Sequence, residues 1–382
     1  MDSHYDVLIM GGGIIGQSIS YHLNKAGVKA GVIDKNKSGQ QATRAAAGML
    51  GVHTENREDD TFYQFCRRSR NLYSGLSKEL RELTGIDIGL TSFGMLEIAA
   101  NQEEKHELLQ KNKTFQNLKW LNGPQLRERI PSLSKEACGA LYMGEDGHVE
   151  PKNVCEAFKR GALLYGGELI ENNTVRKIKQ SAGGYQVQLE DVILTADKVV
   201  AATGAESGKW FEFTGLQNPI VPTKGECFSI QPTTTYFKES LFFNNFYLVP
   251  KPDGRCIIGA TSKPYDQCTT TTAGGLSGLM NQVFSIVPDL KNEPFLDFWS
   301  GVRPGSLDGR PIIGEHPNLS GFLFATGHYR NGILLAPVTG QLVKDLIVNQ
   351  TVDSSIQDLL SPIRIQTSGG SKYEYSSEWQ TC

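Results

Sequence analysis

Two arginines and a tyrosine in this sequence are of the types that hold a small carboxylic acid in one orientation. Arg303 lies in Gly-Val-Arg-Pro-Gly, where a proline restricts the backbone beside it, and Arg330 lies in Gly-His-Tyr-Arg-Asn-Gly. A guanidinium can bind a carboxylate through two parallel hydrogen bonds, which fixes direction as well as charge. Tyr247 carries a hydroxyl that can fix the rotation of such a ligand. We therefore interpret Arg303, in its stiff setting, as a candidate for binding a small anionic substrate, whereas residue type alone does not assign that role to Arg330 or Tyr247.

Each candidate also has a purely structural interpretation. Arg303 can pair with Asp308 or Asp297 and pin a turn. Arg330 can cap backbone carbonyls, and Tyr247 can simply pack within a half-buried strand. No dedicated acid or base stands out, so we assign none. The seven histidines show no H-E-x-x-H or comparable ligand spacing, so we expect no metal site.

Residues 5–34 predict a scaffold that can position these groups. A short apolar run precedes Gly11, Gly13 and Gly16, a helical pattern follows, and a second apolar run ends at Asp34. In such a βαβ unit the three glycines permit, in order, a tight turn, close approach of a pyrophosphate and close packing of helix on strand. The helix N-terminus attracts phosphate, and the acid can accept hydrogen bonds from a ribose. The pattern predicts dinucleotide binding.

The glycine motif alone does not separate NAD from FAD. Residues Ala45 to Gly48 are unusually small and can begin a helix whose backbone lies against a flat ring, or an ordinary alanine-rich helix. No second G-x-G-x-x-G module occurs in the chain. An FAD enzyme reduced by NADPH usually carries one. We therefore expect FAD as the single dinucleotide, with electrons supplied by a small organic substrate.

Later segments predict a return to the first sheet and an insertion between the returns. Residues 196–208 and 321–349 both show an apolar run that ends in Ala-Thr-Gly, typical of strands beside the first one. Residues 61–83 have one apolar helical face, residues 243–262 form a hairpin pattern, and residues 293–301 are expected to be a strand that ends just before Arg303.

The expected fold class is α/β, a Rossmann-like FAD-binding domain with a second, largely antiparallel mixed-sheet substrate domain. The expected FAD-binding domain is discontinuous. The predicted boundaries are 1–85, 146–215 and 302–365 for the FAD-binding domain, 86–145 and 216–301 for the substrate domain, and 366–382 for a disordered tail.

Composition excludes several other classes of protein. The 382 residues include 38 Lys and Arg against 41 Asp and Glu, a net charge of −3, which argues against a nucleic-acid-binding surface. No apolar stretch is long enough for a membrane span, and no signal peptide is evident. The seven cysteines lack C-x-x-C spacing, which favours neither a zinc site nor a disulfide framework. We expect a cytoplasmic protein.

Several segments together resemble bacterial glycine oxidases, the flavoproteins that supply the precursor of the thiamine thiazole ring. Glycine oxidases are related to D-amino-acid and sarcosine oxidases. The resemblance extends to about residue 360, and the last two segments are the most specific. The segments are GGGIIG, AAAGML, HVEP (148–151), KGEC (224–227), GVRPGSLDGRPIIG and GHYRNGILLAPVTG.

The resemblance implies a reaction and a partner. Glycine, O₂ and water would give glyoxylate, ammonia and H₂O₂ through an imine, with hydride passing from the substrate to non-covalently bound FAD. Sarcosine and D-alanine would be further substrates. The resemblance also implies a homotetramer and a possible hand-over of product to a thiazole-forming enzyme.

Site residues are carried over position by position from the resemblance. The implied substrate-binding residues are Arg303, Arg330, Tyr247, Asn245, Ser262 and Met49. The implied FAD-binding residues are Gly11, Gly13, Ile14, Ile15, Gly16, Asp34, Lys35, Gln41, Ala42, Thr43, Ala47, Gly48, Met49, Val175, His328, Tyr329, Arg330, Asn331, Gly332, Ile333 and Leu334.

Three positions depart from the family pattern. Asp34 stands where glutamate is usual, Asn245 where a histidine lies near the pocket, and Ser262 where a methionine lines it. These differences bear on the substrate range more than on the reaction. Two alternatives to an oxidase stay open: an amino-acid dehydrogenase that passes electrons to a quinone or carrier protein, and a non-catalytic FAD-binding subunit.

Overall fold

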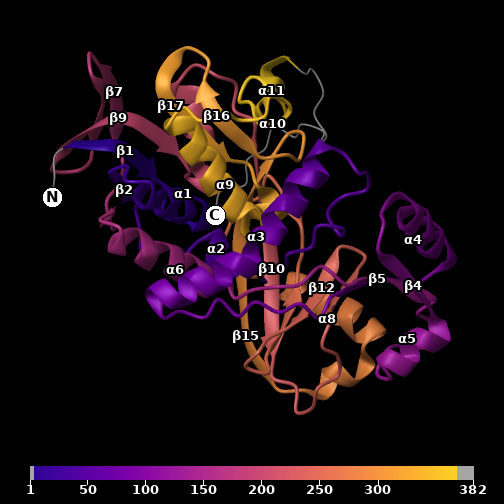
Figure 1. Ribbon diagram of the computed structural model, residues 1–382. Helices are drawn as coiled ribbons and strands as arrows, with labels where there is room; N and C mark the ends of the chain where they lie inside the picture. Colours follow the sequence, from indigo (N-terminus) through magenta and orange to yellow (C-terminus); the bar gives the residue numbers. More distant parts are fainter. Residues whose placement is uncertain (1–3, 368–382) are drawn as a thin grey trace.

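A computed structural model describes residues 4–367, which form two β-sheets with helices around them (Figure 1). The expected α/β fold class is confirmed. The tail expected at 366–382 lies outside the described residues from 368 onward, and residues 366 and 367 belong to helix α11. No helix in the described range is both long and apolar enough to cross a membrane.

The first sheet has eight strands and begins with the predicted βαβ unit. Its strands follow the order β16-β17-β9-β1-β2-β6, with β8 paired to β9 and β7 paired to β8. Both later Ala-Thr-Gly segments return to it as expected, because β9 pairs in parallel with β1 and β17 pairs in parallel with β9. The strands are β1 His4–Met10, β2 Ala30–Ile33, β6 Glu168–Ile170, β7 Lys177–Ser181, β8 Gly184–Gln188, β9 Ile193–Ala201, β16 Ile312–His316 and β17 Leu319–Thr326.

Helices cover this sheet and exclude water from it. α1 packs against α6 and α9, and α3 packs against α9. The apolar face predicted for residues 61–83 is confirmed, since α3 runs from Thr61 to Thr84 and buries Phe62, Phe65, Leu76 and Leu80. The helices are α1 Ile14–Lys25, α2 Ala42–Ala45, α3 Thr61–Thr84, α4 Gln102–Thr114, α5 Gly123–Arg129, α6 Pro151–Leu164, α7 Gly208–Phe213, α8 Ala273–Ile286, α9 Gly332–Ile347, α10 Ser354–Leu360 and α11 Arg364–Thr367.

The second sheet has nine strands and is largely antiparallel. Its order is β14-β10-β13-β12-β11-β3-β5-β4, with β15 paired to β10. The predicted hairpin is confirmed as β12 and β13, which pair antiparallel. The strands are β3 Met95–Ala99, β4 Leu118–Asn122, β5 Gly139–Met143, β10 Ile220–Ile230, β11 Ser240–Phe243, β12 Phe246–Pro250, β13 Cys256–Gly259, β14 Lys263–Pro264 and β15 Phe295–Ser306.

Strand β15 continues through the position where we expected it to end. It runs from Phe295 to Ser306, so Arg303 lies within a strand and not after one. The reason is its long antiparallel pairing with β10, in which Arg303 lies opposite Thr223. Figure 1 shows the two strands side by side, running from the second sheet up to the helices of the first. Arg303 is therefore held by a hydrogen-bonded ladder and not by turns.

Candidate functional site

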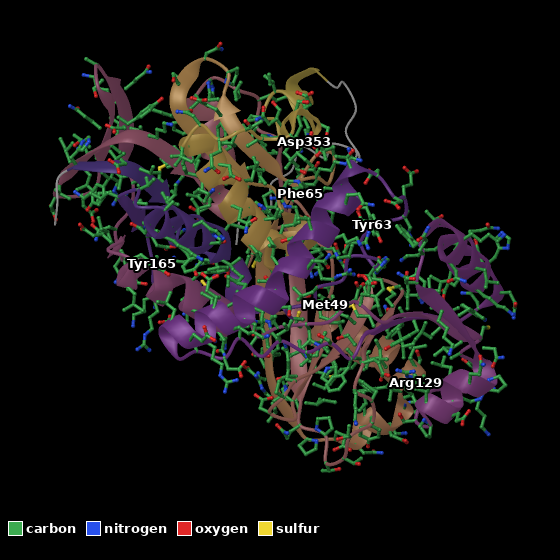
Figure 2. All side chains as sticks on the ribbon, viewed as in Figure 1. Met49, Tyr63, Phe65, Arg129, Tyr165 and Asp353 are labelled. Atoms are coloured by element: carbon green, nitrogen blue, oxygen red, sulfur yellow. The ribbon has the colours of Figure 1, made fainter. Side chains whose placement is uncertain are left out.

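A cavity of about 430 Å³ lies where the two sheets meet, and residues from both line it. Met49, one of these, lies near the middle of the molecule (Figure 2). Most of the predicted site residues are brought together here. The predicted residues that line the cavity are Gly11, Gly13, Ile14, Ile15, Asp34, Lys35, Gln41, Ala42, Thr43, Ala47, Gly48, Met49, Val175, Tyr247, Arg303, His328, Tyr329, Arg330, Gly332 and Ile333.

Five predicted residues do not line the cavity. Asn245 is exposed in the turn between β11 and β12, with φ of 68°. Ser262 is exposed too, but its hydroxyl lies 3.4 Å from the Tyr329 hydroxyl. Gly16 lies in helix α1 where the helix packs closely on the turn after β1. A Cβ there would lie 1.9 Å from the Gly11 carbonyl oxygen, so the position has no room for a side chain. The other two are the buried Asn331 and Leu334, just behind the cavity wall.

The first strand-to-helix turn has the geometry expected for binding a dinucleotide. Gly11 has φ of 105°, and a Cβ there would lie 2.4 Å from the Ala202 carbonyl oxygen, so only glycine fits. Asp34 accepts hydrogen bonds from the Gly12 amide at 2.7 Å and the Asn36 amide at 2.8 Å. Burial raises the pKa of Asp34, and these two amides oppose that shift. The carboxylate is thus fixed beside the cavity, where its remaining lone pairs can accept from a ribose.

The start of helix α1 fits the diphosphate of FAD. Thr43 Oγ1 accepts the Ile14 amide at 3.0 Å, whereas the amides of Gly13 and Ile15 make no hydrogen bond within residues 4–367. A Cβ at Gly13 would meet only Thr43 Oγ1, at 3.6 Å, so the glycine leaves open space at the helix terminus. Unpaired amides and the helix dipole together favour a bound phosphate.

The alanine-rich segment lines the cavity in a different conformation from the one expected. Helix α2 ends at Ala45, and Ala46 is already extended with ψ of 145°, so Ala45 to Gly48 do not begin a helix. The reason is pairing with residues 147–149: the Val149 amide donates to the Gly48 carbonyl at 2.9 Å, and the Leu50 amide donates to the Gly147 carbonyl at 2.8 Å. The segment from Ala45 to Met49 thus forms a wall of small side chains, which fits a flat ring.

Arg303 occupies the cavity face of β15 with its charge uncompensated. Its Nη1 donates to the Thr261 carbonyl at 3.1 Å. Its guanidinium lies over Gly225, where a Cβ would be 2.4 Å from both terminal nitrogens. Neither expected alternative partner takes it, because Asp308 pairs with Arg364 and no ion pair joins Asp297 to Arg303. Within the described part of the chain, Arg303 makes no ion pair and remains able to bind an anion.

Arg330 has a carboxylate partner that the sequence analysis missed. Its Nε donates to Glu55 Oε1 at 2.8 Å, and its Cζ lies 5.5 Å from the centre of the Phe242 ring. Burial alone would lower the pKa of Arg330, and Glu55 more than offsets that effect. Its Nη2 is buried without a hydrogen-bond partner among the described residues. The Arg330–Glu55 pair is close to neutral overall, but its Nη2 group remains able to donate.

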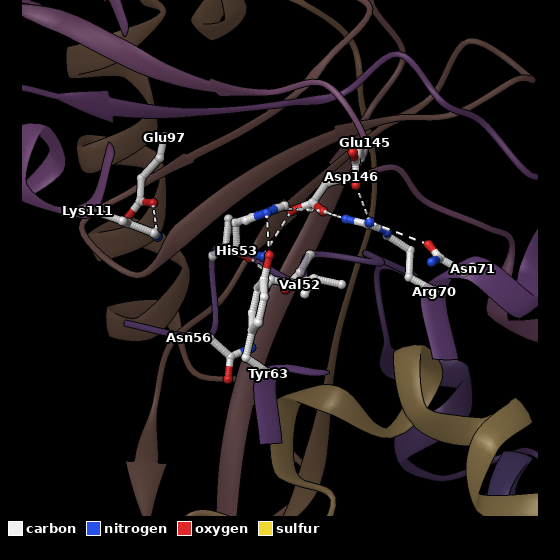
Figure 3. Close-up of polar contacts among 12 residues, drawn as sticks. Val52, His53, Asn56, Tyr63, Arg70, Asn71, Glu97, Lys111, Glu145 and Asp146 are labelled. Carbon is white, nitrogen blue, oxygen red and sulfur yellow. Dashed lines mark hydrogen bonds and ion pairs between the residues drawn. The ribbon is translucent and has the colours of Figure 1, made fainter. Parts of the chain in front are cut away.

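Glu55 is presented by a short loop that a buried polar network holds in place (Figure 3). His53 Nδ1 lies 3.1 Å from Asp146 Oδ1, and its Nε2 lies 3.1 Å from the Tyr63 hydroxyl. Arg70 Nη1 donates to the same Asp146 oxygen at 2.8 Å. The His53 backbone amide also donates to Asp146, so the chain two residues before Glu55 is fixed. A lone acid in a polar loop carries no sequence signal for this role.

Tyr247 and Cys227 line the cavity from the second sheet. The Tyr247 hydroxyl lies 3.5 Å from Cys227 Sγ, and both side chains are buried. Burial raises the pKa of the Tyr247 hydroxyl and of the Cys227 thiol, so both groups carry their protons at neutral pH. A protonated tyrosine here can donate a hydrogen bond to an anion and cannot compete with it as a base.

The histidine that lines the cavity is not suited to act as an acid or a base. His328 lines the cavity, but burial lowers its pKa to about 3 and its Nε2 lies 3.1 Å from Thr339 Oγ1, so it is neutral and tied to the helix α9. Among residues 4–367, no three His, Cys, Asp or Glu side chains cluster as metal ligands.

The described cysteines are mostly free thiols. These are Cys66, Cys138, Cys155, Cys227 and Cys256. Cys268 is disulfide-bonded, a single bond that the cysteine spacing did not predict.

Comparisons with known proteins agree with this geometry. Residues 6–346 match the family model described as FAD dependent oxidoreductase. The chain is 38% identical over 365 residues to a glycine oxidase of Bacillus subtilis, covering 96% of this chain and 98% of the relative. It is 34% identical to a bifunctional ThiO/ThiG protein of Trichormus variabilis, of which it spans 53%.

A solved structure has the same fold over nearly its whole length. The glycine oxidase of Geobacillus kaustophilus superposes with a TM-score of 0.91 at 35% identity, covering 94% of this chain and 98% of that chain. The resemblance to glycine oxidases proposed from the sequence motifs is therefore confirmed. This chain belongs to the family of FAD dependent oxidoreductases, and its similar relatives include bacterial glycine oxidases.

Proposed function

We propose that this protein oxidises glycine and small amines such as sarcosine and D-alanine to the corresponding oxo acid, with release of ammonia or an amine and H₂O₂. The observation that carries the proposal is the uncompensated guanidinium of Arg303, which faces the cavity between Tyr247 and the wall of small residues. Because Glu55 neutralises Arg330, the substrate end carries one net positive charge. That charge fits a substrate with a single carboxylate.

The chain's own residues would bind and orient the substrate. Arg303 would hold the carboxylate through its two terminal nitrogens, and the Tyr247 hydroxyl would donate to one carboxylate oxygen. The unpaired Nη2 of Arg330 offers a further donor from the first-sheet side. Holding reacting atoms in this way can lower a barrier by on the order of 7 kcal/mol. FAD, when bound, accepts the substrate hydride and passes the electrons to O₂.

The residues that would hold FAD lie at the ends of the first βαβ unit and in the segment 45–49. The start of α1 would take the diphosphate, Asp34 the ribose, and residues 45–49 the ring. This chemistry assigns no acid or base to the protein, because a neutral amine loses hydride without prior removal of a proton from carbon. Water then converts the imine to the oxo acid and ammonia, so atoms balance: glycine, O₂ and H₂O give glyoxylate, NH₃ and H₂O₂.

One experiment tests the proposal. The yellow holoenzyme is mixed with glycine without air and then with air. The oxidase proposal requires that the flavin absorbance bleaches without air and returns with stoichiometric H₂O₂ when air is admitted. Bleaching without rapid peroxide release would favour a dehydrogenase that needs a quinone or carrier. No bleaching with glycine, sarcosine or D-alanine would favour a non-catalytic FAD-binding subunit.

We further propose that the product enters thiamine thiazole synthesis in the cytoplasm and that the chain forms a homotetramer. The basis is the family resemblance, together with the fusion of a similar segment to ThiG in the relative from Trichormus variabilis. Sedimentation of the holoenzyme tests the tetramer, and a mass near that of one 42.0 kDa chain would exclude it. Retention on immobilised thiazole-forming enzyme tests the hand-over.

We also propose the division into an FAD-binding domain, 1–85, 146–215 and 302–365, and a substrate domain, 86–145 and 216–301. The sheet to which each strand belongs supports it. Strand β15 passes from one proposed domain into the other, which places Arg303 next to the boundary.

A further inference from the structure

A buried lysine holds the wall of the cavity from behind. Lys251 lies just after β12, and its side chain has no exposed surface. Its Nζ donates to the Ala47 carbonyl at 2.6 Å and to the Val149 carbonyl at 2.9 Å, and lies 2.8 Å from Glu150 Oε1. An ammonium has three donors. Two of the three therefore donate to backbone carbonyls, and the charge of the ammonium pairs with the Glu150 carboxylate.

This arrangement costs more than a packed apolar side chain would. Burial lowers the pKa of Lys251, and Glu150 opposes that shift. A buried ion pair is often no more stabilising than apolar residues of similar volume. The second sheet contains such a pair elsewhere, Lys111 with Glu97, and Lys111 donates to no residue that lines the cavity. The difference between the two lysines is the pair of backbone carbonyls that Lys251 holds.

Fixing the Ala47 carbonyl also fixes the amide that follows it. In a trans peptide the C=O and the next N–H point in opposite directions, and the Ala47–Gly48 bond is trans. The Gly48 amide therefore points away from Lys251. Because Lys251 lies behind the wall and does not line the cavity, the amide points toward the cavity side of the wall. Gly48 has φ of 87°, and its amide makes no hydrogen bond to the rest of residues 4–367. It is a free donor in the part of the wall that fits the ring.

We propose that Lys251 is a positioning residue that turns the Gly48 amide toward the bound cofactor and fixes the distance between that wall and Tyr247. Tyr247 lies on strand β12, and Lys251 directly follows that strand. The ammonium therefore ties the substrate hairpin to the cofactor wall at one point. The part of the proposal that concerns Tyr247 rests on the proposed function, whereas the part that concerns the cofactor does not.

The test replaces Lys251 with methionine in the holoenzyme and uses Lys111→Met as the matched control. Both changes remove a buried ammonium from a glutamate partner. The measurements are the visible flavin spectrum, the FAD dissociation constant from flavin fluorescence, and amide hydrogen exchange of residues 45–50. The steady-state kcat and KM for glycine are then measured for each variant.

We expect Lys251→Met to shift the flavin spectrum, weaken FAD binding by about 10-fold or more, and speed exchange in residues 45–50. Its kcat should fall by about 10- to 100-fold, since loss of alignment affects the chemical step. Lys111→Met should lose stability but keep spectrum, FAD affinity and kcat. Equal effects in the two variants would overturn the proposal, because Lys251 would then act only through general stability.

Glu150→Gln separates the ion pair from the carbonyl contacts. It removes the carboxylate charge and leaves Lys251 able to hold Ala47 and Val149, so we expect a spectrum close to that of the unmodified enzyme. A spectrum that matches Lys251→Met would show that the ion pair matters and not the orientation of the wall. If Lys251→Met does not fold, Lys251→Arg takes its place, and a spectrum unchanged by the longer guanidinium would contradict the proposal.

The outcomes remain separable from those of the proposed function. If no amino acid bleaches the flavin, the proposed substrate class fails. The spectrum, the FAD dissociation constant and the exchange of residues 45–50 are all measured without substrate, and they still decide whether Lys251 orients the wall.

Discussion

Replacing Gly225 with alanine should displace the guanidinium of Arg303 without removing it. A Cβ at Gly225 would lie 2.4 Å from both terminal nitrogens of Arg303 and 2.5 Å from its Cζ. Ordinary contact with a Cβ begins at 3.4 Å, so the guanidinium must move by about 1 Å. Gly225 does not have a left-handed backbone, so alanine adds no backbone strain.

The expected cost is in function and not in stability. The displaced atoms are the far end of a flexible side chain, so the free energy of unfolding should change by less than about 1 kcal/mol. The hydrogen bond from Arg303 to Thr261 would be lost or lengthened. A misplacement of about 1 Å at a reacting centre can cost on the order of 100-fold. We therefore expect kcat/KM for glycine to fall by about 10- to 100-fold, mostly through KM.

The assay is steady-state peroxide release, with the affinity for a carboxylate inhibitor measured by flavin difference spectra. Gly75→Ala is the control, because a Cβ there meets nothing within 4 Å. The same Gly225 change made in an Arg303→Ala background should have almost no further effect, as expected for two residues that act through one contact. Additive losses in the double variant, or an unchanged KM in the single variant, would refute the reasoning.

Three more predictions follow from other contacts. Arg303→Ala should raise KM for glycine by about 100-fold while FAD stays bound, as judged by the flavin spectrum, and an unchanged KM would remove Arg303 from the site. Ser262→Met should change the ratio of kcat/KM for N-substituted glycines to that for glycine, because the Ser262 hydroxyl lies beside Tyr329 at 3.4 Å; identical ratios would show that position 262 does not affect substrate range. Burial lowers the pKa of His148 to about 3, below the ordinary value near 6.5. Between these two pKa values only the unfolded chain binds a proton at His148, so the folded state loses stability as the pH falls from 6.5 toward 3. His148→Gln should therefore reduce the loss of unfolding free energy between pH 7 and 4.5 by about 2 kcal/mol in denaturant titrations, and an equal loss in both proteins would contradict the pKa shift.

Local patterns in the sequence were sufficient to predict the elements that build the cofactor side. The βαβ unit of residues 5–34, helix α3 and the β12–β13 hairpin each depend on spacing within about 30 residues, where period and turn chemistry are informative. The two Ala-Thr-Gly segments predicted return strands, and these lie beside β1 as expected. Short-range periodicity and turn residues carried this part of the prediction.

Contacts between distant segments account for what the sequence could not predict. Glu55 and Arg330 are 275 residues apart, and Lys251 and Ala47 are 204 residues apart. Neither Glu55 nor Lys251 belongs to a motif whose spacing indicates a partner. Strand β15 continues past residue 301 because β10 supplies its hydrogen bonds, a cause that lies outside the segment itself. The small residues from Ala45 to Gly48 favour a helix locally, but pairing with residues 147–149 overrides that preference.

The register of β10 against β15 explains why the site needs glycine on both strands. Gly225 lies directly opposite Gly301, and Thr223 lies opposite Arg303. Residues two apart share a face of a strand, so Arg303 and Gly301 both face the cavity, and the diagonal neighbour of Arg303 is Gly225. Gly225 leaves room for the guanidinium, and Gly301 leaves room for Ala45, whose Cβ would lie 2.4 Å from a Cβ at 301. One pair of facing glycines thus leaves room for the Arg303 guanidinium on one strand and for Ala45 against the other. A shift of one residue in this register would turn Arg303 to the opposite face of the sheet, which is why the long strand pairing, and not a turn beside Arg303, fixes its direction.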